Sequence, residues 1–166
     1  MRRIPMRGMK SLLATAVVLL LAGCQNVTFY TGGGHVAEEE RTALVEGEHN
    51  GSWQARDLSV KYHYARKQDQ MHIDGTIYFA DLLRDNFTLV HDFHLAVILI
   101  DAQGKVLGTH GLIGSSRDDL TPLSFKTRVP LPPNTVSMAF SYQGTALGGG
   151  DHEGGGSAYF WKYPVR

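Results

Sequence analysis

Hydrophobic and polar residues alternate with a period of two along much of the chain after residue 53. The alternation runs through four segments, which are residues 57–64, 71–79, 124–129 and 135–142. Successive side chains of a strand point to opposite faces of a sheet, so this pattern is typical of antiparallel strands with one buried face. It predicts a domain built from strands rather than from amphipathic helices.

Three further segments complete a predicted set of about seven strands. Residues 93–100 (FHLAVILI) are apolar nearly throughout, as expected of a central strand covered on both faces, and residues 106–112 and 159–163 follow later in the chain. Residues 101–105 suit a type I turn followed by a left-handed glycine, and residues 66–69 form a polar four-residue loop. We therefore predict an all-β fold, a single antiparallel β-sandwich that is immunoglobulin-like or transthyretin-like.

Two internal segments lack the strand pattern. Residues 80–88 predict a short helix or a wide loop, in which Leu82, Leu83 and Phe87 either plug the end of the core or form a contact loop. We expect the plug. The glycine-rich residues 148–157 form either a mobile loop that orders on a partner or a crossover that brings a final aromatic strand into the core, and we expect the crossover.

The first 23 residues have the layout of a secretory signal peptide. An apolar run at residues 11–22 follows four basic residues, and it is shorter than the roughly 20 residues that a transmembrane helix needs. Leu21-Ala22-Gly23-Cys24 resembles the bacterial lipobox, which implies cleavage before Cys24 and diacylation of its thiol. Cys24 is the single cysteine of the chain and so has no intramolecular disulfide partner, which lipidation explains. A plain secretory signal and an uncleaved anchor helix are the alternatives.

These features divide the chain into three parts. Residues 1–23 are the predicted signal peptide, residues 24–52 a lipidated, glutamate-rich flexible tether, and residues 53–166 the sandwich. An acidic docking or cation-binding patch is the other interpretation of the glutamates. Gln25 follows the cysteine, and by resemblance to enteric-type lipoproteins this favours an outer-membrane anchor that faces the periplasm.

Charge and motifs narrow the function classes. Without residues 1–23 the chain has 12 basic and 16 acidic residues, so it lacks the basic surface that nucleic-acid binding requires. The sequence contains neither a Gly-x-Ser-x-Gly elbow nor a His-Glu-x-x-His helix motif, and a lipidated Cys24 excludes thiol chemistry. We therefore expect no catalytic residues and no cofactor apart from the lipid.

Histidines are the remaining candidates for chemistry. If the first two strands pair across the loop at residues 66–69, His63 faces His72 with Cβ atoms about 5 Å apart. The two imidazoles are then positioned to share zinc or copper, although two histidines make only half of a typical zinc site. His94, in the polar phase of the central strand, is the third candidate ligand.

Residues 93–109 resemble the central hairpin of the FxLyD-type immunoglobulin-like modules of bacterial envelope proteins. The sequence departs from that motif at Ile100, where those modules carry an aromatic residue. The resemblance implies the fold and no chemistry. The expected function is thus a membrane-anchored, non-enzymatic interaction module, an accessory subunit with an envelope protein partner. The alternative is a periplasmic ligand- or metal-binding lipoprotein that uses His63 and His72, and a hydrolase assembled from distant residues is a third class.

Overall fold

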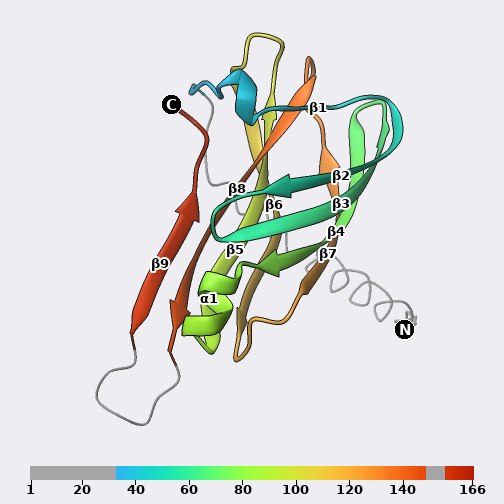
Figure 1. The fold of residues 1–166 in the computed structure, drawn as a ribbon. Coiled ribbons are helices and arrows are strands. Elements are labelled where there is room, and N and C mark those ends of the chain that lie inside the picture. Colours follow the sequence, from blue (N-terminus) through green and yellow to red (C-terminus); the bar gives the residue numbers. More distant parts are fainter. Residues whose placement is uncertain (1–32, 149–155) are drawn as a thin grey trace, which may run out of the picture.

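The computed structural model describes residues 33–148 and 156–166, which form two antiparallel sheets packed as a sandwich (Figure 1). The five-stranded sheet consists of β1 (Thr42–Ala43), β5 (Leu89–Ile100), β6 (Val106–Arg117), β8 (Ser137–Leu147) and β9 (Ser157–Lys162). The four-stranded sheet consists of β2 (Gly47–Gln54), β3 (Leu58–Lys67), β4 (Gln70–Phe79) and β7 (Leu123–Pro130). The predicted all-β sandwich is confirmed.

The core lies between the two sheets and takes the alternate apolar positions of each strand. Leu58, Val60, Ile73 and Ile77 of the four-stranded sheet are fully buried there. Aromatic rings fill the middle of this core, where Phe79 and Phe93 meet edge to face with centroids 5.3 Å apart. Edge-to-face pairs contribute about 0.5–1.5 kcal/mol beyond the burial of their area.

The central strand β5 is covered on both faces over its last four residues, Val97–Ile100, as the apolar sequence there predicts. Val97 and Leu99 point into the sandwich, whereas Ile98 and Ile100 point out of it. The outward pair is covered by Val36, whose amide donates to the Gly104 carbonyl at 2.9 Å. The chain entering the fold therefore supplies a second, smaller apolar cluster that protects one end of this outer face.

The expected tether over residues 24–52 is wrong in the part that the structure describes. A 3-10 turn, η1 (Glu38–Glu40), leads into β1, and β2 pairs with β3 along its whole length from Gly47 to Gln54. The inward positions of β2 include a histidine and a glycine, so no apolar stripe marks the strand. Its backbone hydrogen bonds to β3 and the contact of the His49 and Tyr64 rings, with centroids 5.1 Å apart, hold it in the sheet.

The connections between strands agree with the sequence in two of three places. Gly104 ends the β5–β6 turn with a φ of +88°, as predicted. The segment before β5 contains the short helix α1 (Asp81–Asn86); the expected core plug is confirmed for Leu83 and for the partly buried Phe87, and it is wrong for Leu82, which is exposed. The predicted four-residue loop between β3 and β4 is wrong, because the strands continue to Lys67 and Gln70 and leave a turn of two residues, with Gln68 at a φ of 55°.

Candidate binding site

The shorter β3–β4 turn changes the partners of the candidate histidines. His63 lies opposite Asp74, with its Nδ1 3.4 Å from Asp74 Oδ1, and His72 lies opposite Ala65. The two histidines share the outer face of this sheet but sit two positions apart, so the predicted facing pair is not formed. His94 lies on the outer face of the other sheet, where it pairs with Gly114 and Gln143. The three histidines therefore do not converge, and the described residues contain no group of three or more metal-ligating side chains.

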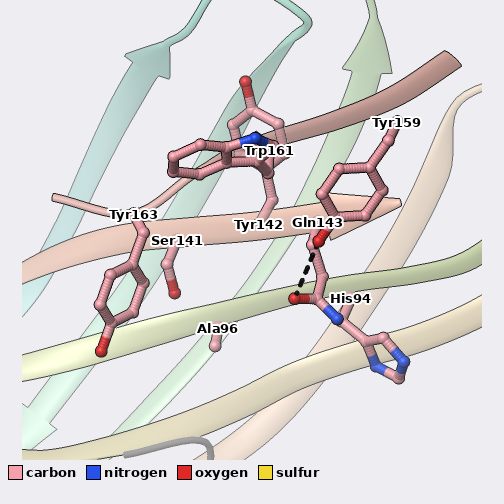
Figure 2. A pocket seen from close by; sticks show the side chains of 8 residues that line it. All are labelled: His94, Ala96, Ser141, Tyr142, Gln143, Tyr159, Trp161 and Tyr163. Carbon is pink, nitrogen blue, oxygen red and sulfur yellow. Dashed lines mark hydrogen bonds between the residues drawn. The ribbon is translucent and has the colours of Figure 1, made fainter. Parts of the chain in front are cut away.

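The outer face of the five-stranded sheet contains a hollow of about 300 Å³ beside β9 (Figure 2). This volume is at the lower end of the range of small-molecule sites, about 300–1,000 Å³. We call it the aromatic hollow and define it by the residues that line it, which are His94, Ala96, Ser141, Tyr142, Gln143, Tyr159, Trp161 and Tyr163.

Small residues form the floor of the aromatic hollow. Ala96 of β5 lies opposite Ser141 of β8 on one side and opposite Gly111 of β6 on the other. The next outward positions of β5 carry Ile98 and Ile100, which Val36 covers. The outer face therefore changes from a packed apolar surface to an open depression within two residues along the strand.

Aromatic side chains of β9 and of the residue directly after it form the rim. Tyr159, Trp161 and Tyr163 are 61%, 57% and 37% exposed, whereas Phe160 between them is 1% exposed in the core. Side chains two residues apart on one face of a strand are spaced by about 6.8 Å. Figure 2 shows Tyr163 and Tyr159 on opposite sides of the hollow with Trp161 between them.

Polar groups of β8 reach the hollow beneath this rim. Gln143 lies opposite both Trp161 and His94, and its Oε1 accepts a hydrogen bond of 3.5 Å from the Tyr159 hydroxyl. The Ser141 hydroxyl points toward the hollow in Figure 2. None of the lining residues is a carboxylate, a lysine or an arginine. The hollow thus combines aromatic faces with groups that both donate and accept hydrogen bonds.

Two contacts fix the strands that carry the hollow. Lys162 Nζ lies 2.7 Å from Glu40 Oε1, which ties β9 to η1, and each side chain is only about one-third exposed. The Tyr142 side chain points the other way, into the sandwich, where its hydroxyl donates to Asp57 Oδ2 at 2.7 Å. Burial, with the adjacent Asp57 carboxylate, raises the pKa of the Tyr142 phenol well above its usual value. Asp57 lies in the turn between β2 and β3 and is 3% exposed, so this buried bond joins β8 to the other sheet at that turn.

The prediction that the aromatic residues of 159–163 enter the core is wrong for the rim. Only Phe160 of this segment is in the core, because its neighbours on either side alternate to the outer face. The signal that could have found the rim is the phase of the strand. Once Phe160 is taken as the inward residue, residues 159, 161 and 163 must point outward.

Comparisons with known proteins assign no relative. No family model, curated protein or solved structure matches the chain. Among the described residues, no helix has the length and apolar character needed to cross a membrane. Cys24 and the lipobox-like residues lie outside the described residues, so lipid attachment stays a prediction from the sequence.

Proposed function

We propose that this chain is a lipid-anchored, non-enzymatic binding protein of the bacterial envelope, which presents the aromatic hollow to a ligand. The aromatic rim carries the proposal. Burying a large apolar side chain contributes about 1.5–3 kcal/mol, and the rim leaves three large side chains exposed around one depression, two of them by more than half. Single exposed apolar residues need no explanation, but a contiguous group around a concave site indicates an interaction surface.

The chemistry of the lining favours binding over catalysis. General acid–base and nucleophilic mechanisms need a titratable group within hydrogen-bond reach of the group it activates. The lining has no carboxylate, and the Ser141 hydroxyl and the His94 ring lie on opposite sides of the hollow in Figure 2. Orientation of a ligand, rather than its conversion, is what this arrangement supports.

The proposed location rests on the N-terminal sequence. The lipobox-like Leu21-Ala22-Gly23-Cys24 supports an anchor of two or three acyl chains, and two chains are enough for stable attachment. Gln25 supports an outer-membrane anchor that holds the sandwich in the periplasm. The membrane is therefore one proposed partner, and the occupant of the aromatic hollow is the other.

The anchor and the hollow can be tested separately in the producing cell. For the anchor, the wild type is expected to incorporate labelled palmitate and to sediment with membranes, and Cys24→Ala to do neither. Label retained in Cys24→Ala would refute lipidation at this residue.

For the hollow, a photo-reactive amino acid replaces Trp161 and, as a matched control, Tyr78. Tyr78 is 39% exposed on the outer face of the other sheet. Adducts are expected from position 161 and not from position 78. Equal yields at both positions, or none at 161, would overturn the proposed binding role.

A further inference from the structure

We propose that the ligand of the aromatic hollow is a neutral pyranose glycan, bound along β9. This inference rests on the proposed binding function and gives it a substrate class. A pyranose ring has a flat face of C–H groups and a perimeter of hydroxyl groups. The first matches an aromatic ring face, and the second matches side chains that both donate and accept hydrogen bonds.

The rim supplies the stacking surfaces in a row. Tyr159 and Trp161 stand on the same side of β9, and Tyr163 follows directly after the strand ends at Lys162, so the outer two residues are at most about 14 Å apart along the chain. Phe160 and the Lys162–Glu40 ion pair fix the backbone between them. Such a row presents ring faces to consecutive sugar units without the entropy cost of ordering a loop.

The floor supplies the polar contacts. The Gln143 amide and the Ser141 hydroxyl each offer a donor and an acceptor, as every sugar hydroxyl does. A polyproline peptide, the other ligand that aromatic grooves bind, presents mainly carbonyl acceptors in this setting. The amide and hydroxyl of the floor therefore favour the sugar.

The charge and size of the hollow narrow the sugar further. Phosphorylated and carboxylated sugars are bound through arginine or lysine, and the lining contains neither. Nucleic acids are disfavoured for the same reason. The volume of about 300 Å³ equals that of roughly ten molecules of liquid water, which suits one neutral hexose ring of roughly a dozen non-hydrogen atoms. Further units of a chain would then lie along the rim on either side.

The experiment uses the full-length chain, purified in a zwitterionic detergent because glycoside detergents would compete for the site. Titration calorimetry and tryptophan fluorescence follow the addition of tetrasaccharides of N-acetylglucosamine, of β-1,4-linked glucose and of α-1,4-linked glucose. A tetrasaccharide of galacturonic acid and a decamer of proline are the comparison probes. We expect saturable binding of at least one neutral tetrasaccharide, with a change in tryptophan emission, and at least about tenfold weaker binding of both comparison probes.

Variants assign the binding to the hollow. Trp161→Ala and Gln143→Leu are each expected to weaken binding at least about tenfold, with Trp161→Phe partly restoring it, and Tyr78→Ala is expected to bind like the wild type. Circular dichroism and a thermal melt of each variant confirm that the fold is intact. Equal weakening in Tyr78→Ala, or unchanged binding in Trp161→Ala, would overturn the assignment.

The result also separates this inference from the function on which it rests. If no neutral glycan binds while position 161 still gives adducts in cells, the glycan inference fails and the binding function stands. Tighter binding of the proline decamer than of every neutral tetrasaccharide leads to the same conclusion. If neither glycans nor adducts are found, both proposals fail.

Discussion

The bond between Tyr142 and Asp57 gives the sharpest prediction about stability. Tyr142→Phe removes the hydroxyl that donates to Asp57 Oδ2 at 2.7 Å and keeps the ring among Trp53 and Phe160. Asp57 is 3% exposed, whereas the side chain of its other partner, Arg56, is 75% exposed. The carboxylate therefore loses its buried donor and keeps only a solvent-screened one.

The magnitude follows from the burial and charge of the acceptor. Hydrogen bonds to charged groups contribute about 1.5–3 kcal/mol to stability. An acceptor left without its donor in the core also carries a desolvation cost that no hydrogen bond offsets. We expect Tyr142→Phe to lower the free energy of unfolding by about 2 kcal/mol. For a domain of this size, that loss corresponds to a fall in Tm of roughly 6–10 °C.

Urea unfolding followed by tryptophan fluorescence measures this loss, with an unchanged m-value as the sign that only stability has changed. Tyr78→Phe is the matched control, because Tyr78 is exposed on the outer face of the other sheet and should change stability by less than about 0.5 kcal/mol. A double-mutant cycle with Asp57→Ala isolates the pair. A coupling free energy near zero, or a loss in Tyr142→Phe no larger than in the control, would refute the reasoning.

Three further predictions concern the rest of the sandwich. Arg66→Met removes hydrogen bonds to the Leu44 and Thr135 carbonyls, at 2.9 and 3.0 Å. It should cost about 2–4 kcal/mol in urea unfolding, and a loss below about 0.5 kcal/mol would contradict it. Gly104→Ala places a Cβ against Arg41 at a φ of +88° and should therefore lower Tm. An unchanged Tm in the thermal melt would disprove this prediction. Burial lowers the pKa of His110 in the folded protein. The unfolded chain therefore binds this proton more readily than the folded chain, and the free energy of unfolding should fall as the pH drops below about 6.5. His110→Asn should flatten this dependence in melts between about pH 5 and 8, and an unchanged slope would rule out His110 as its source.

Much of the fold could be predicted because the buried residues of the strands are apolar and occupy alternate positions in the sequence. Leu58, Val60 and Tyr62 occupy the inward phase in the sequence and in the structure. Strand register depends on something else, the length of the turn. Gln68 adopts a φ of 55°, which glycine and asparagine favour, so the sequence contains no signal for a two-residue turn. Because β3 continues to Lys67, the register between β3 and β4 shifts by two residues. This even shift keeps the side chains of both strands on their expected faces but makes Asp74, instead of His72, the partner of His63.

The aromatic hollow was harder to predict because it depends on contacts distant in sequence. Tyr159, Trp161 and Tyr163 have the composition of a core strand, and local sequence does not say which phase meets the other sheet. The floor is shallow where the small residues Ala96 of β5 and Ser141 of β8 lie opposite each other, with Gly111 of β6 opposite Ala96 on the other side. Pairing between β5, β6 and β8 creates that coincidence, which no single segment encodes.

The place where the chain joins the sandwich sets how far the sandwich can lie from the proposed lipid anchor at Cys24. Gly34 and Val36 are bonded to Val106 and Gly104, and Val36 covers the same outer face that holds the aromatic hollow. Nine residues lead from Cys24 to Gly33, a length of at most about 32 Å even when fully extended. With Cys24 acylated as proposed, this length is the greatest distance between the lipid anchor and the start of the sandwich, so the domain stays close to the bilayer. On the proposed anchor and binding function, the ligand of the aromatic hollow would be met at the membrane surface, as a polymer lying against it or a molecule attached to it.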